Sequence, residues 1–557
     1  MTEKEDYGMR RKIVIVGGVA GGAATAARLR RMDEDAEILL IERGEHVSFA
    51  NCGLPYHIGG EIEDREKLLV MTPAKLRSWF NLDVRVRTEV VAVDREKKEV
   101  ELRHNASGEV IRETYDNLVL SPGAKPVVPD LPGVDSEKIR TLRNLLDMDS
   151  IKALVDGGIT SAVVVGGGFI GLEVAEQLRR RDVAVTLVEL LDQVMPSVDP
   201  EMASPLHATL RDHGVDLRLG TRVEGFKENG AGIGVNLSDG TTLDTDMVLL
   251  AVGVKPESDL AQAAGLEVTD RGTIVVDEHM RTSDPDIYAV GDVVTVRQKQ
   301  LGTPVWLPLA GPASRQGRVA ANHIAGKTPD RFPGVVGTSV CRVFELAVGS
   351  TGLGEKALKE AGVAYHRQYV GPFFHADYYP GAVRITVKVL FSPTDGKLFG
   401  AQVVGAGGID KRVDVLSTAI HAGMTVFDLE DLELGYAPPY GTARDPVNFA
   451  GFAAANRLRG DVEVAEWQDL VDEEDSMLID VRQPEEVEEG GVPGAVNIPL
   501  GVLRNRMKEL PRHKEILVFC GVGQRGYYAY RVLKHHGFKV RNMDGGIMLH
   551  RMVQPPA

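Results

Sequence analysis

The chain of 557 residues has only three cysteines, Cys52, Cys341 and Cys520, and no two of them are close in sequence. Three cysteines cannot form a disulfide scaffold, and a redox site that closes its own disulfide needs two of them a few residues apart. A lone thiol must therefore pair with a sulfur outside the chain or oxidise to a sulfenic acid. We expect Cys341 to be a buried small hydrophobe. The same role is unlikely for Cys52 and Cys520, because glycines and polar residues surround them.

Long apolar runs are also missing. No segment reaches the roughly 18 uninterrupted apolar residues of a membrane span, and the first residues lack the apolar run of a signal peptide. We therefore expect a cytoplasmic protein with free thiols and no membrane partner. Acidic residues outnumber lysine and arginine, 80 to 64, and the formal net charge is −16. This charge argues against nucleic acid as a main partner, but a local basic pocket for a phosphorylated ligand remains compatible with it.

Glycine, by contrast, is abundant. The chain has 61 glycines, which indicates many tight turns and close backbone approaches. The length predicts roughly three or four domains of about 150 residues each. A hydrophobic fraction of 43% and a charged fraction of 26% are ordinary for a globular chain. We therefore expect a multidomain protein.

A first glycine-rich loop follows a predicted buried strand at 12–16 and leads into an alanine-rich helix that ends near Arg31. A second strand, 37–42, ends in Glu42. Glycines allow a tight turn and let helix amides meet a pyrophosphate, while the acid can bond a ribose hydroxyl. This pattern predicts a dinucleotide-binding fold whose loop consists of Gly17, Gly18, Val19, Ala20, Gly21 and Gly22.

The same unit recurs later in the chain. A strand at 161–165 enters a second glycine loop and a helix, and a strand at 183–189 ends in Glu189. One glycine motif often serves packing only, but two with complete strand–helix–strand–acid context indicate two nucleotide sites. The second site is predicted to use Gly166, Gly168, Phe169, Ile170, Gly171, Glu173, Glu189 and Gly253.

Two further segments decide which fold holds which nucleotide. Residues 115–124 and 282–292 resemble the paired segments that complete the FAD domain of two-dinucleotide flavin reductases, with Asp292 on the ribityl chain. The first fold then binds FAD and the second a nicotinamide nucleotide. After Glu189 no lysine or arginine appears before Arg211, so NADH is favoured over NADPH. The expected FAD residues outside the first loop are Glu42, Arg43, Ser121, Pro122, Gly123, Gly291 and Asp292.

Together, these motifs and the segment 48–56 resemble the single-cysteine branch of the pyridine nucleotide-disulfide reductase superfamily. That branch includes coenzyme A disulfide reductases, NADH oxidases and NADH peroxidases. Members that stabilise a sulfenic acid carry a histidine where this chain has Ala20, which disfavours peroxide chemistry. The segment 17–58 and the segment from Tyr436 to Tyr440 are most similar to coenzyme A disulfide reductases and NADH-dependent coenzyme A persulfide reductases. This resemblance covers roughly residues 10–455.

The resemblance implies site residues. Cys52 is the expected nucleophile, resting as a mixed disulfide with coenzyme A. Arginine suits phosphate oxygens, although a solvated helix face is the alternative for Arg28, Arg30 and Arg31. Phe80 stands near where the family places a lysine, and Lys75 or Arg77 is a possible substitute. The expected substrate-binding residues are Arg28, Arg31, Ser48, Asn51, Lys75 and Arg444, and the two tyrosines that approach the cysteine from a partner subunit are Tyr378 and Tyr436.

A different pattern begins after residue 460. A strand at 516–519 leads into Cys520, Gly521, Val522, Gly523, Gln524 and Arg525 before a helix. A cysteine at the carboxyl end of a parallel strand, followed by a loop whose backbone amides converge, is expected to have a lowered pKa. The amides form a binding site for an anionic sulfur. The Cys-x4-Arg loop resembles that of a single rhodanese domain, in which Cys520 and Arg525 would be catalytic.

The expected fold is therefore α/β, with two Rossmann-like folds, an α+β dimerisation domain and a rhodanese domain. A homodimer is implied, and no metal site is assigned. The leading hypothesis is an NADH-dependent flavoprotein reductase of coenzyme A persulfide, polysulfide or coenzyme A disulfide, with Cys520 handling sulfane sulfur. An NADH oxidase or peroxidase using a Cys52 sulfenate, and a sulfur carrier on an inert flavin fold, are the alternatives. The domain boundaries are predicted at 10–150 and 256–330 for FAD, 151–255 for NADH, 331–455 for dimerisation and 462–557 for rhodanese.

Overall fold

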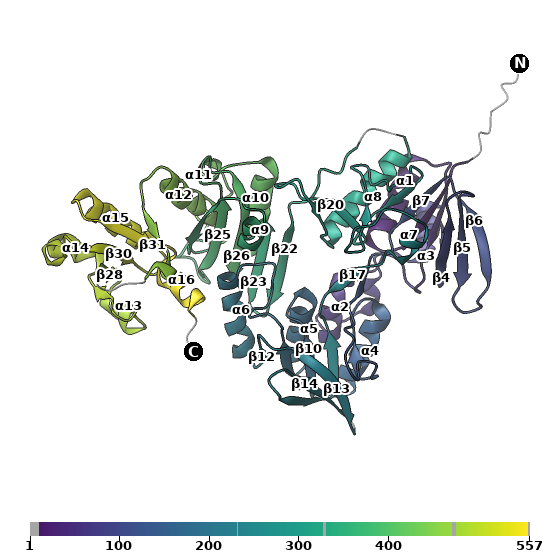
Figure 1. Ribbon diagram of the computed structural model, residues 1–557, viewed down its shortest axis with the longest axis horizontal. Coiled ribbons are helices and arrows are strands. Elements are labelled where there is room, and N and C mark those ends of the chain that lie inside the picture. Colours follow the sequence, from purple (N-terminus) through teal and green to yellow (C-terminus); the bar gives the residue numbers. More distant parts are fainter. Residues whose placement is uncertain (1–9, 231, 327–329, 471–474, 555–557) are drawn as a thin grey trace, which may run out of the picture. The chain divides into compact units, whose positions relative to one another are not determined.

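The computed structural model describes residues 10–230, 232–326, 330–470 and 475–554 (Figure 1). It contains two compact units. The first comprises Met1–Leu190 and Thr221–Val335, and the second Leu191–Gly220 and Val336–Ala557. Each unit is described separately below.

The first unit opens with a parallel sheet in the order β19-β7-β1-β2-β3. Strand β1 pairs in parallel with β2 and with β7, as a Rossmann-like fold requires. Helix α1 (Ala20–Met32) lies beside α8 (Ala310–Ile324), and both contact each other closely (Figure 1). The predicted strands and helix are thus confirmed to within one residue. The strands are β1 (Lys12–Val16), β2 (Glu37–Ile41), β3 (Asp83–Arg85), β7 (Asn117–Leu120) and β19 (Ile287–Ala289).

A second parallel sheet in this unit contains the repeat. Strand β10 (Ser161–Val165) pairs with β11 (Ala184–Val188) on one side and β16 (Met247–Leu250) on the other. Helix α5 (Phe169–Arg179) follows the second glycine loop. The predicted strand 161–165 is confirmed, and the strand predicted at 183–189 is one residue shorter at each end.

The two glycine loops have the same backbone shape. Gly17 and Gly166 have φ of +94° and +106°, which L side chains rarely adopt. A Cβ on Gly17 would lie 2.1 Å from the Ser121 carbonyl oxygen, and one on Gly166 would lie 2.4 Å from that of Ala251. Each loop therefore packs against the strand end beside it only because it carries glycine at this position.

The second unit holds an antiparallel sheet, β22-β23-β26-β25-β24, whose core includes residues of helices α10 (Ile409–Ala422) and α12 (Pro446–Leu458). Helix α12 begins directly after Asp445, because Asp445 and Asn448 form a capping box there. The strands are β22 (Thr338–Val343), β23 (Leu346–Gly352), β24 (His366–Val370), β25 (Ile385–Phe391) and β26 (Leu398–Gly405).

A parallel sheet, β27-β31-β30-β28-β29, forms the carboxy-terminal part of this unit. Helix α15 (Gln524–His535) follows β30, and α16 (Gly546–Val553) follows β31. The expected α/β class, with two Rossmann-like folds, an α+β domain and a rhodanese domain, is confirmed. The strands are β27 (Val464–Ala465), β28 (Ser476–Asp480), β29 (Val496–Asn497), β30 (Glu515–Phe519) and β31 (Val540–Met543).

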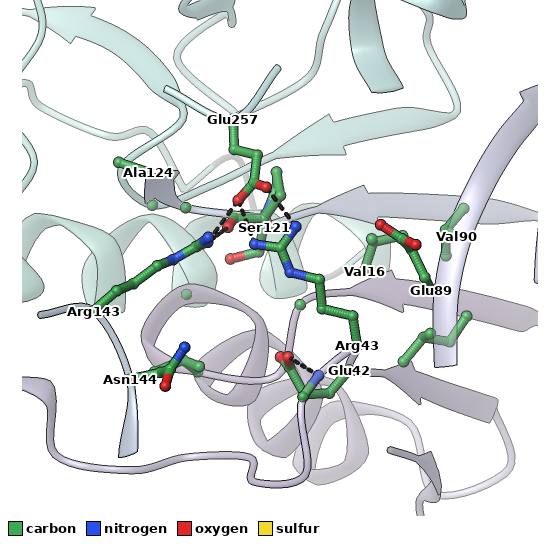
Figure 2. Close-up of a pocket in the computed structure, with 18 of the residues that line it drawn as sticks. Val16, Glu42, Arg43, Glu89, Val90, Ser121, Ala124, Arg143, Asn144 and Glu257 are labelled. Carbon is green, nitrogen blue, oxygen red and sulfur yellow. Dashed lines mark hydrogen bonds and ion pairs between the residues drawn. The ribbon is translucent and has the colours of Figure 1, made fainter. Parts of the chain in front are cut away.

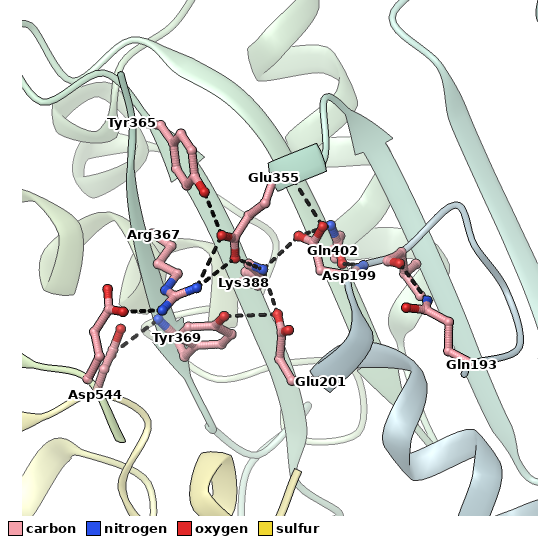
Figure 3. Close-up of polar contacts among 12 residues, drawn as sticks. Gln193, Asp199, Glu201, Glu355, Tyr365, Arg367, Tyr369, Lys388, Gln402 and Asp544 are labelled. Atoms are coloured by element: carbon pink, nitrogen blue, oxygen red, sulfur yellow. Dashed lines mark hydrogen bonds and ion pairs between the residues drawn. The ribbon is translucent and has the colours of Figure 1, made fainter. Parts of the chain in front are cut away.

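Buried charges join the parts of the second unit. The Lys388 ammonium, fully buried on β25, donates to Asp199, Glu201 and Glu355 at 2.6, 2.5 and 2.6 Å (Figure 3). Three carboxylates in this geometry could in principle hold a metal ion, but the ammonium occupies their centre. Because Glu201 lies on α6 (Pro200–Asp212), the cluster fixes this helix to the sheet.

Within the described ranges, no helix combines the length and the apolar character needed to cross a bilayer.

Candidate active sites

The first unit contains a cavity of about 510 Å³ at the carboxyl ends of the strands of its first sheet (Figure 2). This volume is within the range of cofactor sites. Three segments that are distant in sequence meet in its wall, as predicted. They contribute Gly17, Val19, Ala20, Gly21, Glu42, Arg43, Ser121, Pro122, Gly123, Gly291 and Asp292.

The acid at the end of each second strand binds the glycine loop of its own fold. Glu42 accepts the Gly18 N–H at 2.9 Å, and Glu189 accepts the Gly167 N–H at 2.6 Å. A carboxylate has about four acceptor positions, and Glu42 uses two of them for the Gly18 and Gly44 N–H groups, which leaves capacity for a ribose hydroxyl. Neither α1 nor α5 has an acid in its first turn, which leaves both helix amino ends suited to a pyrophosphate.

Among the charged residues that line the cavity, Arg143 and Glu257 were not predicted from the sequence. Glu257 lies between the guanidinium groups of Arg43 and Arg143, with bonds of 2.9 and 2.5 Å (Figure 2). These two arginines hold the pKa of Glu257 below its ordinary value against the effect of burial. No local motif marks Arg143 or Glu257, because their pairing arises only from the fold.

The second glycine loop has open space where a nucleotide would approach. A Cβ on Gly168 or on Gly253 would meet nothing within 4 Å, whereas one on Gly171 would lie 1.9 Å from the Gly166 carbonyl oxygen. Gly171 therefore serves close packing, and Gly168 and Gly253 leave the approach free. Phe169 and Ile170 begin helix α5, and Ile170 is exposed.

Cys52 lies in a short 3₁₀ turn, Asn51–Gly53, just before helix α2 (Leu54–Gly59). Its thiol is exposed, and Asn51 beside it lines the cavity. Desolvation raises the pKa of Cys52, and the carboxylates of Glu173 and Asp292 raise it further. The protein groups alone therefore oppose formation of the Cys52 thiolate.

The loop before Cys52 is strained. Ser48 has a φ of +47°, which is rare for a residue other than glycine, and its N–H donates to the Gly18 carbonyl at 2.7 Å. Residues held in such conformations often belong to functional sites. Ser48 thus connects the cysteine segment with the first glycine loop, although it does not line the described cavity.

The basic residues on α1 differ from one another. Arg28 donates to the Asn322 side chain at 2.7 Å, and Arg31 is exposed. The alternative prediction of a solvated helix face is wrong for Arg30. This side chain is 4% exposed, and its guanidinium donates hydrogen bonds to the carbonyls of Phe80 and Asn81. This side chain is structural. Lys75 is exposed near the start of α3 (Pro73–Phe80).

In the second unit, the two predicted tyrosines meet. The hydroxyls of Tyr378 and Tyr436 are 2.9 Å apart, and both side chains are exposed. The hydrogen bond to Tyr436 raises the pKa of Tyr378. Arg444 is also exposed, and its guanidinium lies 5.4 Å from the Phe449 ring.

The Cys520 loop lies between β30 and α15. The sequence expectation that Cys520 is not buried is wrong, since it is 1% exposed, like Cys341. The start of α16 covers it, because the Ile547 N–H donates to the Cys520 carbonyl at 2.8 Å. The two Nη atoms of Arg525 each bind Glu486 at 2.6 Å, and the pKa of this carboxyl falls to about 2.

Two dinucleotide folds, a glycine-lined cavity and an adjacent lone thiol define a flavoprotein reductase of the two-dinucleotide class. The chain belongs to the pyridine nucleotide-disulphide oxidoreductase family: that family's model matches residues 11–317, and its dimerisation domain matches 338–446. A rhodanese-like domain matches residues 463–549.

Known proteins resemble the chain over most of its length. Coenzyme A disulfide reductase of Staphylococcus haemolyticus (strain JCSC1435) is 35% identical over 80% of this chain and 99% of its own. The crystal structure of reduced Bacillus anthracis CoADR-RHD has a TM-score of 0.96 and 49% identity, covering 99% of both chains. A NAD-dependent persulfide reductase from A. fulgidus has a TM-score of 0.92 and 39% identity, over 97% of this chain and 99% of that one.

Proposed function

We propose that this protein is an NADH-dependent flavoprotein reductase of coenzyme A persulfide, polysulfide and coenzyme A disulfide, with Cys52 as nucleophile. The observation that carries the proposal is the single exposed thiol of the first unit, which lies next to a cavity-lining residue and has no second cysteine in that unit to pair with. Such a thiol suits a cycle through a mixed disulfide with a substrate thiol. The names of the similar proteins support coenzyme A as that thiol.

The reaction is an exchange at sulfur. The Cys52 thiolate attacks the coenzyme A sulfur of a persulfide, the S–S bond breaks, and hydrosulfide leaves with the electron pair. Cys52 is then in a mixed disulfide with coenzyme A. Two electrons and one proton return the thiolate and release coenzyme A. With a disulfide as substrate, the first leaving group is a coenzyme A thiolate instead.

The chain's groups fit both nucleotides. The first glycine loop, Glu42 and Asp292 would hold FAD, and the second loop with Glu189 would hold NADH. When bound, FAD supplies the two-electron transfer between the nicotinamide and the sulfur of Cys52. Glu173 accepts a hydrogen bond from the Tyr56 hydroxyl at 3.1 Å, so its carboxylate lies near the Cys52 turn. Its negative charge raises the pKa of Cys52 and disfavours the Cys52 thiolate.

The carboxy-terminal domain would handle sulfane sulfur at Cys520. The loop amides and the Arg525–Glu486 pair shape this site. The exposed tyrosine pair, together with the matched dimerisation domain, supports a homodimer in which Tyr378 and Tyr436 complete the partner's cysteine site.

NADH oxidation tests the proposal when coenzyme A persulfide, coenzyme A disulfide and polysulfide are each supplied anaerobically and oxygen is supplied in a separate aerobic assay. Turnover with the sulfur substrates at rates well above that with oxygen is expected. A higher rate with oxygen than with every sulfur acceptor would instead indicate an NADH oxidase. The resting mass provides a check, since a coenzyme A adduct is expected and an added oxygen is not.

A further inference from the structure

Arg384 forms no ion pair with a carboxylate in the described part of the chain, although Asp377 and Glu486 act on it from further away. The residue is exposed and pairs with Phe373 in an isolated bridge just before β25. One Nη donates to the Gly371 carbonyl at 2.6 Å, and the guanidinium lies 4.1 Å from the centre of the Phe373 ring. Its Nε and second Nη make no hydrogen bond within the described part of the chain. These donors are available to a ligand.

The carbonyl that Arg384 binds belongs to a residue packed on the Cys520 loop. A Cβ on Gly371 would lie 2.8 Å from Cγ1 of Val522 and 2.8 Å from Sδ of Met548. Val522 is two residues after Cys520, and the Met548 N–H donates to the Gly521 carbonyl at 3.0 Å. The dimerisation domain, through Gly371, therefore contacts the Cys520 loop directly.

The charges of the loop act on Arg384. Burial lowers the pKa of Arg384 and Arg525 lowers it further, whereas Cys520, Asp377 and Glu486 act in the opposite direction. The loop's own arginine is already engaged, because both Nη atoms of Arg525 bind Glu486. Arg525 also interacts with Cys520 itself. Arg384, which has no ion pair in the described part of the chain, is therefore a second cation beside this loop that can bind an anion.

Buried polar contacts fix this arrangement. Strand β24 ends one residue before Gly371, and on it Gln368 donates to Asp544 at 2.5 Å while the Tyr369 hydroxyl donates to Glu201 at 2.9 Å (Figure 3). Asp544 belongs to the rhodanese-like domain, and Arg457 donates to the Arg367 carbonyl at 2.8 Å. The position of Gly371 against the loop is thus part of a packed junction.

We propose that Arg384 binds the oxyanion end of a sulfane-sulfur donor while Cys520 attacks its outer sulfur, so that two domains share one donor site. The inference rests on the proposed role of Cys520. With thiosulfate, the Cys520 thiolate takes the outer sulfur, the S–S bond breaks, and sulfite leaves with the electron pair. Cys520 becomes a persulfide. Arg384 binds the sulfonate oxygens and stabilises the charge that gathers on the leaving sulfite.

The test compares two donors in the full-length flavoprotein, with cyanide as acceptor and thiocyanate as product. Thiosulfate carries an oxyanion, and diallyl trisulfide is a neutral source of sulfane sulfur. Arg384→Gln should lower kcat/KM for thiosulfate about tenfold or more, mainly through KM, because a charge-assisted hydrogen bond is lost. Turnover of the trisulfide should stay within about twofold, since it offers no anion to the arginine. Arg384→Lys should recover part of the loss.

The control is Arg504→Gln, which removes an exposed arginine of α14 (Leu500–Arg506) and should leave both donors unaffected. Unchanged thiosulfate kinetics in Arg384→Gln would overturn the inference, and so would an equal loss with both donors. A wild-type enzyme that used only the trisulfide would overturn it as well. Inactivity with both donors would overturn the proposed role of Cys520 itself. If Arg384→Gln does not fold, Phe373→Leu must raise the thiosulfate KM instead, because the ring no longer supports the guanidinium.

Discussion

At the scale of single residues, the pKa of the Cys52 thiol is raised first by burial and then by two carboxylates. Glu173 and Asp292 both raise its pKa. A positive group or a bound nicotinamide near this turn would therefore have a large effect on nucleophilicity. The cysteine is exposed enough to be reached by a substrate, and its protein surroundings favour the neutral thiol over the thiolate.

Glu173→Gln should accelerate alkylation of Cys52 by iodoacetamide near pH 7. The substitution removes a negative charge that raises the pKa of this cysteine, so the thiolate forms at lower pH. The measurement is the alkylation rate against pH after reduction of the enzyme. Glu66→Gln, an exposed acid elsewhere in the unit, is the control. If the pH midpoint of the Cys52 alkylation rate were unchanged or higher in Glu173→Gln, Glu173 would not be a group that raises the pKa of Cys52.

Glu189 should decide between the two nicotinamide nucleotides. Its carboxylate would face the extra phosphate of NADPH, so NADH is expected to be preferred by more than about tenfold in kcat/KM. Glu189→Gln keeps an oxygen that can accept the Gly167 N–H and removes the negative charge. The ratio of kcat/KM for NADH to kcat/KM for NADPH should therefore become smaller. Equal wild-type specificity for both nucleotides would count against this role.

At the scale of elements, the junction between β24 and the rhodanese-like domain contains an unusual acid. Asp544 is fully buried, burial raises its pKa to about 7, and one carboxylate oxygen has no hydrogen-bond partner among the described residues. The native carboxyl keeps its proton up to about pH 7, whereas an unfolded aspartate loses it near pH 4. The native state therefore binds more protons between these values, and this group lowers stability as the pH rises from about 4 to about 7.

Asp544→Asn should weaken this pH dependence. The amide cannot ionise, and its oxygen can still accept from Gln368 and Tyr369. The drop in Tm between pH 5.5 and pH 8 should be smaller than in the wild type, while Glu485→Gln, on exposed helix α13 (Pro484–Glu488), should match the wild type. Identical pH slopes in Asp544→Asn and wild type would show that Asp544 does not titrate in this range.

The elements themselves were largely predictable. Strand β10 and the two glycine loops follow from local apolar runs and turn residues, so the sequence defines them closely. The burial of Cys520 was not predictable, because α16 covers it from 26 residues further along the chain. The same holds for Lys388 and Glu257, whose partners are distant in sequence. Local patterns predict elements, and long-range pairing decides which charges meet.

At the scale of the whole molecule, the two sulfur sites should be separable. Cys520→Ser should lose sulfur transfer from thiosulfate or polysulfide and keep most NADH turnover with coenzyme A persulfide supplied directly. The reason is that Cys52 lies in the first unit, whereas Cys520 belongs to the core of the rhodanese-like domain in the second unit. Loss of both activities, with the circular dichroism spectrum intact, would show that sulfur must pass through the Cys520 loop first.

The proposed nucleophile is tested most directly by anaerobic turnover of NADH with coenzyme A persulfide in wild type and Cys52→Ser. Wild-type enzyme should release one sulfide and one coenzyme A for each NADH consumed. The Cys52→Ser variant should retain FAD, since glycines and carboxylates form that cavity, but release no sulfide. A variant that keeps its flavin and still reduces the persulfide at the wild-type rate would contradict the central role of Cys52.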